Sequence, residues 1–250
     1  MSNERALSFG QVADEYDRWR PGYPTQAIAD IVAEGTRVLE SGAGTGKATV
    51  ALARAGASVV AVEPDPSMAD LIRSRCAGDD VEVRVSTIEN CVVPDHSFDV
   101  VCAAQSWHWV DPVAGAAVAA KALRPGGALC VFGNRLRDID GPAWAAVNEV
   151  YAEYAPELDR RVEIEVHAKF EQNLARPEGF SPWTVTTYDW TAEYDPDGFV
   201  GLLGTFSNHI ALPADKRDRL LGAVHSAVSD SAAGHIEYHY VTVLATAHVE

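Results

Sequence analysis

Between residues 36 and 133 the chain alternates short apolar runs, rich in β-branched residues, with alanine-rich stretches, and turn residues separate the two. This pattern is typical of strands that alternate with helices. Such connections require a mostly parallel sheet with helices on both faces. The predicted strands are 37–41, 58–63, 81–86, 98–104 and 127–133, and the predicted helices are 46–57, 65–76 and 112–127.

The pattern changes after residue 134. An aromatic-rich segment there predicts a helix, and an irregular mixture of acids and bases follows it. Two further strands are separated by two helical segments, and no internal repeat or flexible linker interrupts the sequence. One domain over residues 1–250, carrying an insertion, therefore fits better than two domains. The predicted elements of this part are the helix 142–158, the strands 183–191 and 236–249, and the helices 196–209 and 214–228.

The charge of the chain bears on its partners. Thirty-six acidic and twenty basic residues give a formal net charge of −16. A charge of this sign repels a polyanion unless the basic residues gather on one face, and here they are scattered along the sequence. We therefore expect no nucleic-acid partner.

The termini, cysteines and histidines suggest a cytoplasmic protein. The opening MSNERALSFG has no apolar segment, and no stretch of about 18 consecutive apolar residues follows. The four cysteines form no CxxC pair, and the histidines of GHIEYHYV (234–241) lack acidic or cysteine companions at the spacing of a metal site. We expect no membrane association and no metal, and the oligomeric state stays open.

The stretch ESGAGTGKAT (40–49) carries the most specific chemistry. A phosphate-binding P-loop needs four residues between its first glycine and the Gly-Lys pair, followed by Ser or Thr. Here only three residues separate Gly42 from Gly46, and Ala48 stands at the hydroxyl position. A nicotinamide-dinucleotide turn reads GxGxxG, whereas this turn reads GxGxG. The P-loop is excluded, the nicotinamide alternative is weakened, and Lys47 is expected to point to solvent.

A second strand ends in Glu63, seventeen residues after Gly46. In open α/β sheets, ligands bind beyond the carboxyl ends of the strands, where the strand order reverses. Glycines let a ligand approach the backbone closely, and a carboxylate at the strand end can accept hydrogen bonds from both ribose hydroxyls. The sequence thus predicts a ligand that contains adenosine but needs no pyrophosphate.

Four motifs in order, VLESGAGTGKAT, VVAVEPDPSM, VSTIENCVVPDHSFDVVCAAQSWHWVD and ALRPGGALCVFGN, resemble the class I S-adenosylmethionine-dependent methyltransferases. Together with the leading LSFGQVADEYDRWRPGYP, they resemble the small-molecule branch that includes trans-aconitate methyltransferase-like proteins. The resemblance covers residues 7–134 well. It implies a doubly wound, mostly parallel, seven-stranded α/β sheet of Rossmann-like type, with an antiparallel C-terminal edge hairpin.

The resemblance also divides the single domain and assigns the cofactor, S-adenosyl-L-methionine. It implies an N-terminal lid (1–24), a cofactor-binding core (36–134), an insertion that helps to form the acceptor pocket (135–182), and C-terminal strands and helices (183–250). The implied cofactor-binding residues lie in the lid and at the strand ends: Tyr16, Arg20, Glu40, Gly42, Ala43, Gly44, Gly46, Glu63, Met68, Thr87, Ile88, Ala104 and Gln105.

The resemblance gives each group of these residues a role. The glycine turn would line the methionine end of the cofactor, with Glu40 near its ammonium group and Glu63 on the ribose diol. Met68 would pack on the adenine, and Thr87 and Ile88 would face its edge. Thr87 stands where an aspartate is common in the family, so the contact with the adenine amino group would be weaker.

Methyl transfer from a sulfonium is an in-line displacement that needs no metal and no covalent enzyme intermediate, so alignment and water exclusion can supply much of the catalysis. The candidate catalytic residues are His108 and Tyr16. His108 would be a general base for a protonated hydroxyl or amine acceptor, or it would pack under the following helix. The aromatic residues of the lid (1–24) likewise would either shield the site from water or simply pack against the sheet.

The run QSWHW (105–109) differs from the Asn/Asp-Pro-Pro-aromatic motif by which relatives grip planar amide-like nitrogens. We therefore expect a small-molecule acceptor, methylated on oxygen or nitrogen. Around it we expect Asn134, Arg135, Trp144 and Tyr151, with Arg135 a surface charge. The alternatives are an S-adenosylmethionine-binding protein without catalysis and, less favoured, an NAD-dependent oxidoreductase.

Overall fold

The computed structural model describes residues 17–136, 141–158 and 176–250 of the chain. Seven strands form a sheet in the order β3-β2-β1-β4-β5-β7-β6. The first five strands pair in parallel, whereas β7 runs antiparallel to both β5 and β6. The mostly parallel seven-stranded sheet with an antiparallel C-terminal edge is confirmed. The strands are β1 (Arg37–Ser41), β2 (Ser58–Glu63), β3 (Val81–Val85), β4 (Phe98–Ala104), β5 (Leu123–Leu136), β6 (Thr184–Tyr194) and β7 (Ile236–His248).

Local signals in the sequence set where the helices begin. The Asp65 carboxylate accepts hydrogen bonds from the first turn of α5 and the Asp111 carboxylate from that of α6, and a proline follows each aspartate. The helices are α3 (Thr25–Ala29), α4 (Lys47–Arg54), α5 (Pro66–Arg75), α6 (Pro112–Ala122), α7 (Pro142–Tyr154), α10 (Pro196–Gly204), α11 (Ser207–Ile210) and α12 (Ala214–Ser229), with 3-10 turns η2 (Ile88–Asn90) and η3 (Trp107–Trp109).

The helix predicted over 196–209 is two helices, α10 and α11, because the chain leaves helical geometry between Thr205 and Phe206. The predicted end of another helix is also wrong. The helix expected over 112–127 ends at Ala122, and β5 begins at the next residue. Leu123 pairs with Phe98, and the register shifts before Val100 pairs with Ala128. Pairing with β4 thus starts before the Pro-Gly-Gly sequence, where the Leu123 side chain is buried in one apolar cluster with Phe98.

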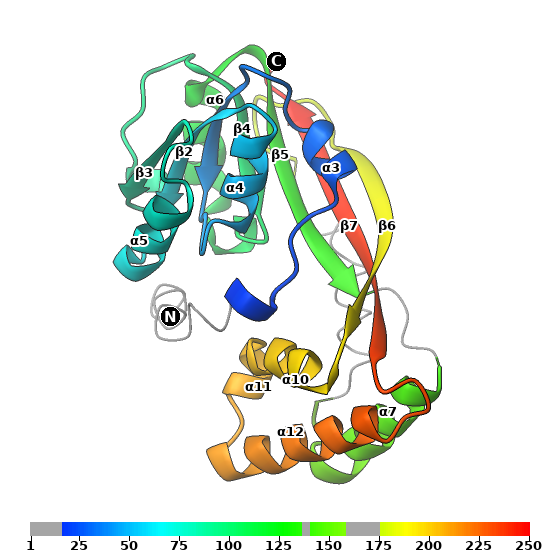
Figure 1. The fold of residues 1–250 in the computed structure, drawn as a ribbon. Helices are drawn as coiled ribbons and strands as arrows, with labels where there is room; N and C mark the ends of the chain where they lie inside the picture. The colour runs from blue at the N-terminus through cyan, green and yellow to red at the C-terminus, as the bar shows by residue number, and fades with distance from the viewer. Residues whose placement is uncertain (1–16, 137–140, 159–175) are drawn as a thin grey trace.

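The inner parallel strands β1, β2, β4 and β5 are buried on both faces, which explains their continuous apolar runs, whereas the edge strand β3 has no fully buried residue. Val38 packs in the cluster formed with α4, whereas its neighbour Leu39 packs in the cluster formed with α6. A third apolar cluster joins α7, α10 and α12 to the far ends of β5 and β7, around Trp144. Figure 1 shows these long strands running from the first part of the sheet to the helices at the opposite end of the molecule.

A chain of buried and partly buried hydrogen bonds ties the last strands to the N-terminal segment. The Trp190 indole donates to Thr242 Oγ1 over 2.9 Å, and the Thr242 hydroxyl donates to Asn134 Oδ1 over 2.7 Å. The Asn134 amide nitrogen then donates to the Gly22 carbonyl over 2.9 Å. These bonds hold residues from β6, β7 and β5 against the segment that precedes α3.

Thr242→Val keeps the shape of a fully buried side chain but removes its hydroxyl. It leaves the Trp190 donor and one Asn134 acceptor without this partner, so we expect a loss of about 1–3 kcal/mol in the free energy of unfolding. Urea unfolding measures it. Thr186→Val, at an exposed position of β6, is the control and should change stability little. Equal effects of the two substitutions would contradict the network.

Candidate functional site

The strand order reverses between β1 and β4, and the glycine turn follows β1 at this point. Gly42, Gly44 and Gly46 all have positive φ, of 63°, 59° and 86°. A Cβ on Gly42 would lie 2.6 Å from Ser106 Cβ, and the Ser106 hydroxyl donates to the Ser41 carbonyl over 2.5 Å. A side chain at position 42 would therefore prevent the end of β4 from meeting the end of β1. Around Gly44, no atom of the described residues outside its immediate chain neighbours lies within 4 Å of such a Cβ.

A cavity of about 960 Å³ opens at this edge of the sheet. It brings together residues from the segment before α3, from the ends of β1, β2 and β4, and from η2 and η3. The sequence-predicted residues that line it are Arg20, Gly42, Ala43, Gly44, Glu63, Met68, Thr87, Ile88, Ala104, Gln105 and His108. Glu40 and Gly46 lie behind the lining, and Tyr16 lies outside the described residues.

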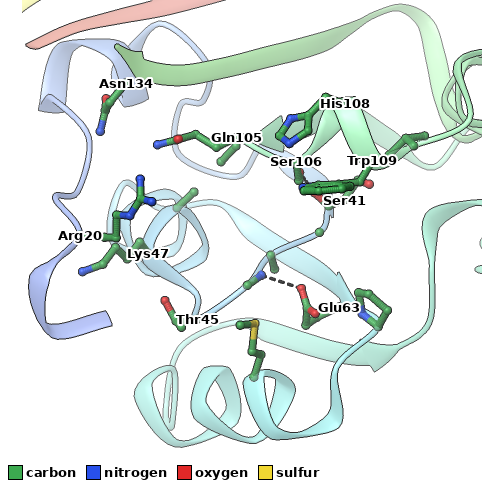
Figure 2. Close-up of a pocket in the computed structure, with 18 of the residues that line it drawn as sticks. Arg20, Ser41, Thr45, Lys47, Glu63, Gln105, Ser106, His108, Trp109 and Asn134 are labelled. Carbon is green, nitrogen blue, oxygen red and sulfur yellow. Dashed lines mark hydrogen bonds between the residues drawn. The ribbon is translucent and has the colours of Figure 1, made fainter. Parts of the chain in front are cut away.

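The Glu63 carboxylate connects the glycine turn to the start of α5. One oxygen accepts from the Gly44 N–H over 2.7 Å (Figure 2), and the other accepts from the Asp65 N–H over 2.9 Å. Burial raises the pKa of Glu63, while the two backbone hydrogen bonds lower it. Because a carboxylate can accept about four hydrogen bonds, Glu63 keeps acceptor positions for a ligand.

Glu40 lies directly under the turn and is fully buried. One carboxyl oxygen accepts from the Thr49 hydroxyl over 2.6 Å, and the other has no hydrogen-bond partner. Burial raises the pKa of Glu40 to about 8, since an ionised carboxylate in an apolar setting is costly. Glu40 is therefore protonated in the free protein at neutral pH.

The loop after β4 places a strained residue at the cavity. Gln105 has a φ of 56°, which is uncommon for a residue other than glycine. Its backbone N–H donates to the Phe132 carbonyl over 2.8 Å, and a Cβ on Gly133 would lie 2.8 Å from its Cγ. Gly133 thus leaves room for the Gln105 side chain, which points into the open cavity in Figure 2.

His108 and Trp109 follow in η3, and both line the cavity. Their rings lie 4.7 Å apart, and 42% of Trp109 is exposed. Burial and the nearby Arg135 guanidinium lower the pKa of His108. The His108 imidazole is therefore neutral at pH 7, the form that accepts a proton.

The matching methyltransferase domain family aligns with residues 39–131. Over 251 aligned residues the chain is 34% identical to the uncharacterized methyltransferase Rv3342 of Mycobacterium tuberculosis, and the alignment covers 97% of each protein. The chain belongs to the methyltransferase family. A demethylmenaquinone methyltransferase of Clavibacter sepedonicus is 34% identical over 137 residues, which cover 49% of this chain and 55% of that one.

The fold agrees with this assignment. A solved structure of a proposed type II methyltransferase from Anaeromyxobacter dehalogenans has a TM-score of 0.67 to this chain at 23% identity, and covers 92% of this chain and 97% of its own. The resemblance to class I methyltransferases is therefore confirmed for family and fold. Within 17–136, 141–158 and 176–250 no helix is long and apolar enough to cross a membrane, and no three His, Cys, Asp or Glu side chains gather as a metal site requires.

The expectation that Lys47 points to solvent was wrong. Lys47 is the first residue of α4, and its side chain lines the cavity of the methyltransferase. Its Nζ lies 3.5 Å from Asp17 Oδ1, and burial lowers its pKa. The position of Lys47 directly after the glycine turn is consistent with this placement. The mismatch with the P-loop pattern excludes a phosphate site of that type, but it does not decide where the lysine side chain points.

Three further expectations about side chains needed correction. Arg135 is half-buried beside His108 and is not a surface charge. Trp144 and Tyr151 pack in the third apolar cluster, away from the cavity lining: the Trp144 indole donates to the Glu237 carbonyl, and the Tyr151 hydroxyl pairs with His209. Of the insertion residues proposed for the acceptor pocket, Asn134 lines the cavity. Thr87 also lines it, and its hydroxyl accepts from the Asn90 amide over 3.0 Å.

The sequence reasoning missed the wall of the cavity that faces the glycine turn. This wall comes from β5, α10, α11 and β7, which are distant in sequence. Arg20 connects to it, because its guanidinium donates to Thr205 Oγ1 over 2.8 Å and lies over the Phe206 ring. The lining residues of this wall are Leu136, Leu202, Phe206, Ser207, Asn208, Tyr238 and Tyr240.

Glu40→Gln removes the ionisable group under the turn while keeping an acceptor for Thr49. Folding raises the pKa of Glu40 from 4.5 to about 8. Between these values the unfolded chain ionises and the native chain keeps its proton, so the carboxyl lowers native stability as the pH rises. We expect Glu40→Gln to gain stability over the wild type as the pH rises, by at most about 3 kcal/mol near pH 7.

Urea unfolding between about pH 5 and pH 8 measures this difference. The matched control is Glu82→Gln on β3, where the Arg84 hydrogen bond lowers the pKa of the carboxyl, so that no such gain should develop. A stability difference for Glu40→Gln that does not change with pH would show that Glu40 is ionised in the native protein.

Proposed function

We propose that this methyltransferase takes its methyl group from S-adenosylmethionine and transfers it to an oxygen or nitrogen of a small molecule. The observation that carries the proposal is the single cavity of about 960 Å³ that joins the glycine turn to the apolar wall. This volume lies at the upper end of the range for small-molecule sites. It has room for a nucleoside donor and an acceptor together.

The residues of the turn fit the donor. Among the described residues, the space beside Gly44 is one that a side chain would fill, so a ligand could lie against the bare backbone there. Glu63 stands at the end of β2 with acceptor positions left for a ribose diol. We infer that Met68 packs on the adenine and that Thr87 and Ile88 border its edge, since these residues line the same part of the fold after β2 and β3.

S-adenosylmethionine supplies a methyl group bound to a positively charged sulfur. The acceptor's nucleophile would attack the methyl carbon in line with the C–S bond, and the sulfur would leave as a neutral thioether. The chain's own residues then orient and shield the reactants. Ala104 and Gln105 at the end of β4 border the place where donor and acceptor meet. The neutral His108 ring can accept the proton of a hydroxyl or amine acceptor. The rings of Phe206 and Tyr238 exclude water on the opposite side.

The acceptor side is particular to this chain and its full-length relatives. The family match ends at residue 131, before Leu136 and the walls from α10 and β7. The similarity to the demethylmenaquinone methyltransferase likewise covers about half of each protein, so its acceptor does not transfer to this chain. The apolar wall favours a small acceptor with an apolar body. The net charge of −16 disfavours a nucleic acid.

Calorimetric titration with S-adenosylhomocysteine and with NADH tests the donor, and we expect binding of the first alone. Glu63→Ala should weaken S-adenosylhomocysteine binding by about 1.5–3 kcal/mol, the range for a hydrogen bond to a charged group. Glu82→Ala, on the exposed side of β3, should leave binding unchanged. If the protein bound NADH but did not bind S-adenosylhomocysteine, the proposal would be wrong.

Transfer of a labelled methyl group to a panel of phenols, amines and carboxylic acids tests the reaction. A labelled product establishes catalysis and names the acceptor class. Tight binding of S-adenosylhomocysteine with every acceptor and extract fraction left unlabelled would favour a binding protein without catalysis. The two titrations and the transfer assay therefore separate the three alternatives.

His108 predicts the pH dependence for a hydroxyl or amine acceptor. Burial and Arg135 lower the pKa of His108 below 6.5. We therefore expect kcat/KM to be independent of pH above neutral pH and to fall only below pH 6.5, where His108 becomes protonated. His108→Asn should remove this acidic limb and reduce kcat/KM about 10²–10⁴-fold. His225→Asn, at an exposed site on α12, is the control. An unchanged limb in His108→Asn would assign His108 to packing.

A further inference from the structure

The cavity has an uneven distribution of charge. Among the described residues, the acids that line it are Glu63, Glu89 and Asp111, and backbone N–H groups donate to each of them. They lie at the end of β2, in η2 and before α6. The lysine and arginine that line it are Lys47 and Arg20, which border the other side of the glycine turn. In Figure 2 the Arg20 and Lys47 side chains lie near each other, on the side of the view opposite Glu63.

The carboxylate near Lys47 is shared with a stronger partner. Both terminal nitrogens of Arg75 contact the Asp17 carboxylate, and the Arg75 guanidinium also donates to the Thr45 carbonyl over 2.8 Å. Lys47 lies 3.5 Å from the same carboxylate, an ion-pair distance that is long for a hydrogen bond. Within the described residues, the Arg75 guanidinium and the Lys47 ammonium both contact this one carboxylate, and Lys47 has the longer contact, so a ligand anion could offer Lys47 a closer partner.

Burial makes this position of Lys47 costly. About a quarter of its side chain, 23%, is exposed, and desolvation lowers the pKa of its ammonium group. A lysine on the first turn of a helix is also unfavourable, because the helix dipole is positive there. A ligand anion would offset both costs, since among the described residues no side chain caps the N-terminus of α4, where Lys47 begins the helix.

We propose that Lys47 binds the carboxylate of the amino-acid end of S-adenosylmethionine, an inference that rests on the proposed function. Glu63 and the adenine-facing residues lie on one side of the turn, so the opposite end of a bound donor reaches the side where Lys47 begins α4. On binding, the Lys47 ammonium exchanges its long contact with Asp17 for a charge-assisted hydrogen bond to the carboxylate. Arg75 keeps Asp17 in place during this exchange.

Two ligands that differ in one group test the inference. S-adenosylhomocysteine carries the carboxylate and the ammonium, whereas its decarboxylated form, S-adenosyl-3-thiopropylamine, keeps only the ammonium. We expect Lys47→Gln to weaken S-adenosylhomocysteine binding about tenfold or more and to leave the affinity for the decarboxylated ligand unchanged. Lys47→Arg should retain most of the affinity, because it keeps the charge. Calorimetry measures the dissociation constants of both ligands for the wild type and the two variants.

Lys121→Gln is the matched control. This lysine on α6 also pairs with an aspartate, Asp95, at 3.4 Å, but it lies outside the cavity lining. Equal weakening of both ligands by Lys47→Gln, or an unchanged affinity for S-adenosylhomocysteine, would overturn the inference. An unchanged affinity for S-adenosylhomocysteine would instead assign the anion that binds Lys47 to the acceptor. If the wild type bound neither ligand, the proposed function would be wrong as well. The failure of the Lys47 inference alone is therefore distinguishable from the failure of the proposed function.

Discussion

The contact between Gly42 and Ser106 is the constraint on which the site depends. A Cβ at position 42 would lie 2.6 Å from Ser106 Cβ, far inside van der Waals contact. Only glycine lets the end of β4 approach the end of β1, where the Ser106 hydroxyl donates to the Ser41 carbonyl. The strand order reverses between these two strands. The cavity opens there because their loops diverge to opposite faces of the sheet.

The electrostatics of the site follow from this close packing. Glu40 is fully buried under the turn, and the same burial raises its pKa to about 8. Burial also raises the pKa of Glu63, but the hydrogen bonds from the Asp65 and Gly44 N–H groups partly offset that rise. Beyond the turn, Asp17 binds Arg75 and leaves Lys47 with a long contact. One face of the turn therefore presents acceptors, and the other presents a partly desolvated cation.

The two sides of the cavity have different structural origins. The glycine turn, Glu63 and η2 belong to the part matched by the methyltransferase domain family, residues 39–131. The opposite wall depends on the long strands β5 and β7, which carry Leu136 and Tyr238 beyond the parallel sheet and onto the helices of the third apolar cluster (Figure 1). The buried bonds through Thr242 and Asn134 hold this extension to the N-terminal segment. The proposed donor site thus lies in the part that matches the domain family, and the proposed acceptor wall lies largely outside that match.

The sequence by itself determined the sheet, the turn and most of the donor side. These features rest on local signals: the apolar runs of strands buried on both faces, the capping by Asp65 and Asp111, and the spacing of the glycines. The tertiary structure alone decided that Lys47 faces the cavity, that Arg135 lies beside His108, and that Phe206 and Tyr238 complete the wall. Those placements depend on contacts between residues as far apart as Arg20 and Thr205. Periodicity and spacing describe a residue's own element, whereas the direction in which a side chain is buried depends on what packs against that element.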